Sequence, residues 1–275
     1  MKELTTRELQ LFSLEILKDV AAFCEKNDIK YSLGYGTMLG AIRHKGFIPW
    51  DDDVDIMMTR ENYEKFRKTY KSENYEYIDS DNIEDCYIAF GRVCDRKKTR
   101  TYSYIPWHGG SLHTGVWIDI FPVDNVSEDI NEYRSMHNAL LLLNNQNGRL
   151  RRMHASEGDV YSTYRSLWAR ILKSMNPRVG NYPPTEVVKS LNAIIALSNA
   201  QKSTKMSQLA CPSNMDEYYD AADLQEYTLV DFEGYKFSVW SQYDKLLTIV
   251  YGDYMQLPPE KDRRPLQHYI KFYYL

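Results

Sequence analysis

Three aspartates spaced two residues apart carry the clearest chemistry in this sequence. Asp51, Asp53 and Asp55 follow Trp50 and precede the apolar run 56–58, which favours a partly buried strand. Alternate residues of a strand share a face, so the three carboxylates are expected to point the same way. Close carboxylates repel unless a cation or solvent separates them, and oxygen ligands suit Mg²⁺ or Mn²⁺. The spacing predicts a metal site held by Asp53 and Asp55, with Asp51 as a direct or water-mediated ligand; the alternative is an acidic, solvated turn.

A glycine-rich turn precedes the aspartates by about fifteen residues. Gly34, Gly36 and Gly40 lead into and lie within a short predicted helix over 37–43. A turn that enters a helix presents free backbone N–H groups and the positive end of the helix dipole, which attract anions. The spacing fits neither a Walker A loop nor a dinucleotide fingerprint. We expect Gly36 and Thr37 to contact a phosphate beside the metal.

Three blocks of the chain resemble the LicD family. The first runs from Gly36 to Ile56 and reads G-T-x-L-G-A-x-R followed by I-P-W-D-D-D-x-D-I; the others cover 115–124 and 251–260. The resemblance implies a nucleotidyltransferase-like fold, related to the catalytic domains of fukutin and fukutin-related protein. It also implies the activity of bacterial members, which move phosphocholine from CDP-choline onto cell-surface glycans.

The second block carries a further carboxylate on a strand predicted over 115–121. Asp119 lies among apolar residues, where an unpaired carboxylate is costly to bury. In nucleotidyltransferase-like folds a third carboxylate on a neighbouring strand completes the site, so the resemblance implies that Asp119 is a metal ligand or the general base. The alternative is a structural aspartate, the role we expect for Asp124.

Cationic side chains are expected to neutralise the charge that develops as CMP leaves. Arg43 and Lys45 follow the glycine turn, and Arg92 lies on a strand predicted over 87–93. Arg43 and Lys45, or alternatively Arg92, are expected to stabilise the departing CMP. We assign Arg92 to catalysis and Arg43 and Lys45 to substrate binding, although these last two could equally be surface charges.

The choline headgroup is a quaternary ammonium, which aromatic faces bind with or without a carboxylate. Aromatic residues in or beside the three blocks are the candidates: Tyr104, Trp107, Trp117, Tyr251 and Tyr254. Because the chain has 23 tyrosines, most are expected to be structural. Trp117 and Tyr251 are assigned to substrate binding.

Periodicity and turn signals predict the elements that position these residues. Thr5 to Glu8 has the form of a capping box and opens a helix to about Asn27. Further predicted elements are a strand over 31–35, a helix over 60–71, a mainly helical stretch over 125–208, a strand pair over 227–239, a helix over 240–251 and a Pro-rich tail. We expect an α+β fold with a nucleotidyltransferase-like mixed sheet in the catalytic core 1–125 and a mainly helical region 126–275 packed on it.

Composition limits the class of protein and its compartment. The 275-residue chain has a net charge of −4, which argues against a nucleic-acid partner. It has no apolar run of membrane-spanning length and no secretory signal, and its four scattered cysteines indicate reduced thiols. We expect a cytoplasmic protein. Between residues 140 and 180, seven Lys/Arg against two Asp/Glu could hold it weakly at the inner face of an anionic membrane; the alternative is a solvated helix face.

These observations predict a metal-dependent phosphotransferase that moves phosphocholine from CDP-choline to a hydroxyl of a glycan or lipid-linked glycan precursor, of teichoic acid or lipopolysaccharide type. One alternative keeps the fold but changes the reaction to nucleotidyl transfer, or the donor to another CDP-linked alcohol such as ribitol or glycerol. A non-catalytic nucleotide-binding protein is the third alternative. The clustered carboxylates argue against it, because a binding module has no need of them.

Overall fold

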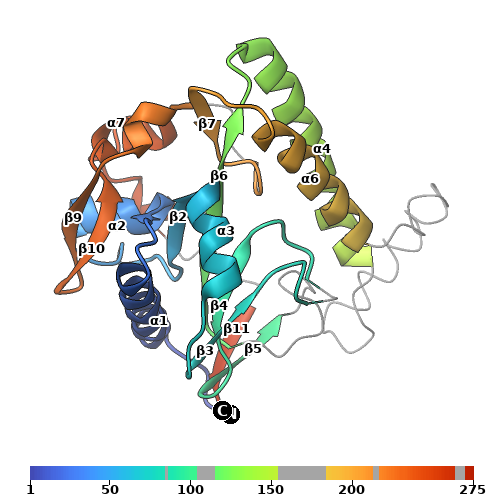
Figure 1. Cartoon of the computed structure of the whole chain (residues 1–275). Coiled ribbons are helices and arrows are strands. Elements are labelled where there is room, and N and C mark those ends of the chain that lie inside the picture. The colour runs from blue at the N-terminus through green and yellow to red at the C-terminus, as the bar shows by residue number, and fades with distance from the viewer. Residues whose placement is uncertain (84–85, 104–114, 154–183, 213–216, 264–269) are drawn as a thin grey trace.

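A mixed β-sheet occupies the centre of the protein (Figure 1). The computed structural model describes residues 1–83, 86–103, 115–153, 184–212, 217–263 and 270–275. The main strands lie in the order β1 (Ser32–Leu33), β2 (Asp55–Thr59), β6 (Trp117–Val126), β4 (Gly91–Asp95) and β3 (Tyr75–Ile78). β2 and β6 are parallel, and the other neighbours are antiparallel. The mixed sheet is therefore confirmed.

β6 is the longest of these strands and connects the whole sheet. It pairs with β4 over residues 117–120 and with β2 over residues 119–123. Its far end, residues 124–126, pairs with β7 (Lys205–Ser207). β7 in turn pairs with β8 (Tyr219–Asp220). Chain segments from both halves of the sequence therefore meet on β6.

The alternation predicted for residues 115–121 is found in β6. Ile118 and Ile120 are fully buried and lie on the face opposite Trp117, Asp119 and Phe121, because successive side chains of a strand point to opposite faces. Helices α1 (Thr6–Lys26) and α3 (Arg60–Thr69) pack against this strand. The strand extends further than predicted, to Val126.

Helix α1 begins at the predicted capping box. The Thr5 hydroxyl accepts from the Glu8 N–H, and the Glu8 carboxylate accepts from the Thr5 N–H. Both groups would otherwise be orphaned at the helix start. The apolar residues spaced three or four apart along this segment predict one buried stripe on the helix. Of these residues, Leu9, Ile16, Val20 and Cys24 are buried in the core and Phe12 is partly buried. The stripe fixes α1 against the sheet.

The remaining helices confirm most of the predicted helical segments. α2 (Tyr35–His44) precedes β2, and α7 (Tyr243–Tyr251) packs against α2. α4 (Ile130–Met153) packs against α6 (Pro184–Asn199). Single 3-10 turns are η2 (Ala221–Leu224) and η3 (Glu260–Asp262). Residues 154–183 of the predicted helical stretch lie outside the described residues.

Two strand pairs lie beside the central sheet. β9 (Tyr227–Phe232) and β10 (Tyr235–Trp240) form the predicted hairpin. β5 (Thr99–Ser103) pairs with β11 (Ile270–Tyr274), which bonds also to the N-terminal residues through Leu4. Figure 1 shows both termini together at this edge.

Several sequence predictions need correction. β3, β5, β7, β8 and β11 were not predicted, and β7 lies within the stretch 125–208 that was expected to be mainly helical. The strand expected over 87–93 is displaced to Gly91–Asp95. Asp51 and Asp53 were expected within a strand, but β2 begins only at Asp55. The division of the chain at residue 125 stays a prediction.

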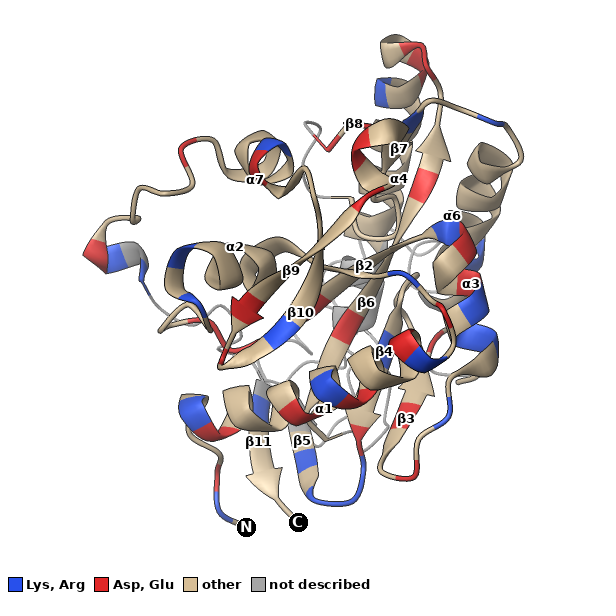
Figure 2. Ribbon diagram, turned by 60° about the vertical axis from the view of Figure 1, so that its left-hand side comes forward, with Lys and Arg blue, Asp and Glu red and all other residues tan. Residues whose placement is uncertain are grey.

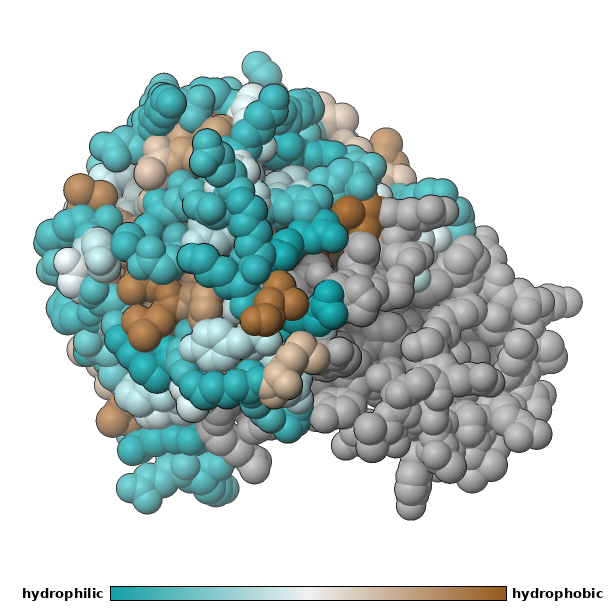
Figure 3. All heavy atoms as spheres, turned by 90° about the horizontal axis from the view of Figure 1, so that it is seen from below, coloured by the Kyte–Doolittle hydropathy of each residue, from teal (hydrophilic) through white to brown (hydrophobic). Residues whose placement is uncertain are grey.

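Charged residues of both signs are interspersed along α1 and α3 (Figure 2). The face shown in Figure 3 is mainly hydrophilic over the described residues, with small separate apolar patches. Within the described part of the chain, no helix combines the length and apolar character that crossing a membrane requires.

Candidate active site and metal centre

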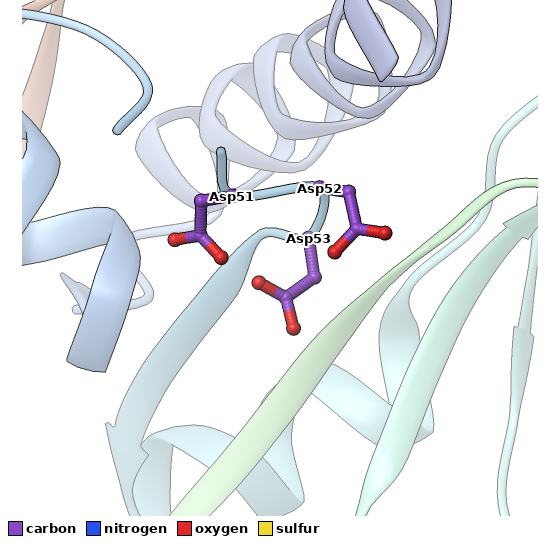
Figure 4. Close-up of side chains that lie close together, drawn as sticks. All are labelled: Asp51, Asp52 and Asp53. Carbon is purple, nitrogen blue, oxygen red and sulfur yellow. The ribbon is translucent and has the colours of Figure 1, made fainter. Parts of the chain in front are cut away.

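The three consecutive residues Asp51–Asp53 form a loop before β2, here called the acidic loop. One carboxylate oxygen from each lies within 4.8 Å of the others, and Figure 4 shows the side chains projecting to the same side. The Asp51 N–H donates to the Ile48 carbonyl at 2.9 Å. This closes a turn with Pro49 at its second position, which its fixed φ favours. The turn, rather than strand alternation, therefore gathers the carboxylates, and it brings in Asp52.

The charged forms of the acidic-loop carboxylates are unfavourable, because the loop is partly buried and its aspartates lie close together. Burial, reinforced by the neighbouring aspartates, raises the pKa of Asp51 to about 8 and the pKa of Asp52 to about 7. The buried Oδ1 of Asp52 has no hydrogen-bond partner among the described residues. Such groups must be neutralised by protons or by a cation. Oxygen donors of this kind fit a hard divalent cation such as Mg²⁺ or Mn²⁺.

Asp55 and Asp119 lie directly opposite each other on the parallel strands β2 and β6. Burial raises the pKa of Asp55 well above its usual range, and Asp53 and Asp119 add to this effect. Asp119 is paired in turn with Arg92 on β4. A row of three charged residues therefore crosses the centre of the sheet, next to the acidic loop.

Arg92 is buried and forms an ion pair with Asp119. Its Nε donates to Asp119 Oδ1 at 2.5 Å, and its side chain is 2% exposed. The guanidinium also lies over the ring of Trp117, 4.3 Å from its centroid. Burial raises the pKa of Asp119, and the positive charge of Arg92 partly offsets this rise. The structure thus joins Arg92, Asp119 and Trp117 in one buried cluster.

The start of α2 makes hydrogen bonds to Asp55 and approaches Asp51 closely. The Thr37 hydroxyl accepts from the Asp55 N–H at 2.9 Å, and the Gly34 N–H donates to the Asp55 carbonyl at 2.9 Å. A Cβ at Gly36 would lie 2.6 Å from Asp51 Oδ2, closer than real Cβ contacts allow. Thr37 therefore helps to position Asp55, and Gly36 leaves the space that Asp51 occupies. The phosphate contact expected of both residues stays a prediction.

Arg43 and Lys45 lie at the other end of α2. Arg43 Nη1 donates to the carbonyls of Tyr254 at 2.6 Å and Gln256 at 3.4 Å, so it holds the loop that follows α7. Lys45 ends the helix in a left-handed conformation with φ of 60°, and its carbonyl accepts from the Glu233 N–H. Arg43 thus acts through its side chain on the loop after α7, whereas the contact of Lys45 is made by its backbone. The assignment of both residues to substrate binding stays a prediction.

The predicted headgroup aromatics are distributed unevenly. Tyr251 is 41% exposed, and its phenol lies within the electrostatic influence of Asp55 and Asp51. Trp117 is 5% exposed and packs against Phe272 and Arg92. Tyr104 and Trp107 lie outside the described residues. Of the candidates that the structure describes, Tyr251 is thus the exposed one.

Gln10 was missed by the sequence analysis. It is 4% exposed on α1, and its Nε2 donates to the Asp51 carbonyl at 2.7 Å. Arg7 orients the same amide by donating to its Oε1 at 3.1 Å. A polar residue beside Leu9 on the buried stripe of α1 was the available signal, because buried amides need partners.

Comparisons with known proteins show what this chain is similar to. The family model "LicD/FKTN/FKRP, nucleotidyltransferase domain" matches residues 28–141. The chain is 32% identical over 280 aligned residues to the "Lipopolysaccharide cholinephosphotransferase LicD" of Haemophilus influenzae, covering 100% of both. It is also 44% identical over 54 residues to an uncharacterized protein of Rickettsia typhi, covering 20% of this chain and 18% of that protein. A protein of Rickettsia prowazekii is 48% identical over 48 residues, covering 18% of each chain.

Proposed function

Because this chain belongs to the LicD family, we propose that it transfers phosphocholine from CDP-choline to a hydroxyl of a cell-surface glycan precursor. The relative that aligns with it end to end is named a lipopolysaccharide cholinephosphotransferase, which supports a lipopolysaccharide-type acceptor. The observation that carries the proposal is the acidic loop beside Asp55 and Asp119. Phosphoryl-type transfer depends mainly on positioning and on neutralising phosphate charge, and this cluster is suited to both.

We further propose that the sheet is nucleotidyltransferase-like. The description of the matching family model supports this. So does the position of Asp55 and Asp119 on adjacent central strands, since residues paired in register direct two carboxylates to one face of the sheet.

The acidic loop is proposed to hold Mg²⁺ or Mn²⁺. Asp51, Asp52 and Asp53 supply the ligand oxygens, with Asp55 beside them. A divalent cation there supplies positive charge for the donor pyrophosphate. The backbone at the start of α2, around Gly36 and Thr37, is proposed to contact a phosphate.

Asp119 is proposed as the group that accepts the proton of the acceptor hydroxyl. The hydroxyl oxygen bonds to the phosphorus that carries choline, the bond from that phosphorus to CMP breaks, and the proton passes to Asp119. Its buried setting raises its pKa, which suits a base. Arg92 holds its orientation, so Arg92 acts on the reaction through Asp119.

The test uses the purified protein with Mg²⁺, a lipopolysaccharide oligosaccharide acceptor and a panel of CDP-choline, CDP-ribitol, CDP-glycerol and nucleoside triphosphates. We expect release of CMP with CDP-choline and incorporation of phosphocholine into the acceptor. Asp53→Asn should lose this activity, whereas Asp231→Asn, on the exposed hairpin, should keep it. Release of pyrophosphate from a triphosphate, or preference for another CDP-alcohol, would contradict the proposal.

Contact with a membrane-borne acceptor also stays a proposal. Most of the basic segment 140–180 lies outside the described residues, including the side chains of Arg149, Arg151 and Arg152. Changing these three to Ala should weaken co-sedimentation with anionic vesicles at low salt. Equal binding by the variant would contradict a docking role for this segment.

A further inference from the structure

A buried carboxylate and two tyrosines lie on the same side of the sheet as Asp119. Glu217 is 3% exposed, and its Oε2 accepts from the Tyr35 hydroxyl at 2.7 Å and from the Tyr219 hydroxyl at 3.4 Å. A phenol that donates to a carboxylate gains electron density in its ring. These rings therefore attract cations more strongly than an ordinary tyrosine does.

Tyr35 connects this carboxylate to the acidic loop. It begins α2 and precedes Gly36, where an added Cβ would meet the Asp51 carboxylate. Its ring packs edge-on against Phe121 at 5.5 Å between centroids, and Phe121 shares a face of β6 with Asp119. Tyr35 has φ of 40°, an unfavourable conformation for a tyrosine. Such strain is typical of positions fixed by their surroundings at a functional site.

Tyr251 is the last residue of α7, the helix that packs against α2, and it is accessible. Tyr251 is 41% exposed. Partial burial raises the pKa of its phenol, and Asp55, Asp51 and Glu217 each contribute to the rise. The phenol of Tyr219 is influenced in turn by Glu217 and Tyr251. An exposed tyrosine on a helix that packs against α2 is thus within the electrostatic influence of the acidic loop and of Glu217.

We propose that Tyr251 and Tyr35 bind the quaternary ammonium group of the donor by their rings, with Glu217 as the buried counter-charge behind them. The inference rests on the proposed function, because it concerns the same donor. The donor is suited to such a site: its pyrophosphate is anionic and its headgroup is cationic, so the two ends need opposite environments. The negative potential of Glu217 favours a trimethylammonium group over an uncharged group of the same shape. The site therefore selects the donor by headgroup charge.

The test compares CDP-choline with the CDP ester of 3,3-dimethylbutan-1-ol, in which carbon replaces nitrogen and the shape is kept. Calorimetric titration with Mg²⁺ gives both affinities without an acceptor. We expect wild type to prefer CDP-choline by about tenfold. Tyr251→Ala and Glu217→Gln should each remove most of this preference, while affinity for the uncharged ester changes little.

Tyr235→Ala is the matched control, because Tyr235 is 45% exposed on the β9–β10 hairpin. It should keep the full preference. If Glu217→Gln fails to fold, Tyr251→Ala, which changes an exposed side chain, still decides the result.

The possible failures are distinguishable. Wild type that binds neither ester overturns the donor assignment and this inference with it. Wild type that prefers CDP-choline while both variants keep that preference overturns the headgroup site alone. Equal loss of affinity for both esters would assign these residues a structural role and would also overturn the inference.

Discussion

Arg92 and Asp119 face each other across the antiparallel strands β4 and β6, and Arg92 Nε donates to Asp119 Oδ1 at 2.5 Å. Both residues are buried. Asp119 also lies opposite Asp55 on β2. The one cation in this row therefore offsets part of the repulsion between two carboxylates and fixes the orientation of Asp119.

Breaking this pair from one side should destabilise the protein strongly. Arg92→Met leaves Asp119 without its cation in a buried setting, so the free energy of unfolding should fall by about 3–5 kcal/mol. Urea denaturation measures this change. The double variant Arg92→Met with Asp119→Asn should recover part of the loss, because it removes both charges. Strictly additive losses would contradict the coupling.

Stability should fall as pH rises in the metal-free protein. The pKa values of Asp51 and Asp52 rise in the folded state to about 8 and about 7, from ordinary values near 3.8. Between about pH 4 and pH 8 the folded protein therefore binds more protons than the unfolded chain, and the free energy of unfolding decreases with pH. Thermal melting in EDTA from pH 5 to pH 8.5 should show this trend. Asp51→Asn should flatten it and raise Tm at pH 8.

Added Mn²⁺ should raise Tm much more at pH 8 than at pH 5.5, because protons compete with the cation for the same oxygens. Melting curves with and without Mn²⁺ at the two pH values measure this. An equal effect at both, or no effect, would argue against a cation in the acidic loop.

Gln10→Leu should weaken cation binding by the acidic loop, although Gln10 itself lies on α1 and supplies no ligand. The variant loses the bond to the Asp51 carbonyl, which should cost about 1 kcal/mol of stability and weaken Mn²⁺ binding severalfold. Calorimetric titration of Mn²⁺ measures the second effect. Gln225→Leu is the control, since that amide donates to the Ala221 carbonyl in an exposed position. Unchanged Mn²⁺ affinity in Gln10→Leu would remove its positioning role.

Gly36→Ala should displace Asp51, because the added Cβ would lie 2.6 Å from its Oδ2. We expect Mn²⁺ affinity and turnover to fall at least tenfold while the fold persists. In the background of Asp51→Ala, the same substitution should have little further effect, since the contact is already gone. Independent losses in the double variant would show that Gly36 acts through another contact.

Local features of this protein could be predicted from the sequence because they depend on neighbours along the chain. The capping box at Thr5 and Glu8, the buried stripe of α1 and the 227–239 hairpin are examples. Each is specified by hydrogen bonds or periodicity within a few residues. The acidic motif could be recognised in the same way, since Asp51, Asp53 and Asp55 are close in sequence.

Contacts between distant segments were decided only by the tertiary structure. β11 pairs with β5 across more than half the chain. The register of β4 on β6 pairs Arg92 with Asp119, which the sequence did not show, and the assignment of Arg92 to the departing CMP stays a prediction. Glu217 reaches Tyr35 only because β7 and β8 return to the sheet beside β6. Sequence periodicity predicts which face of an element is buried, but not which partner covers it, because register and packing are set by the whole chain.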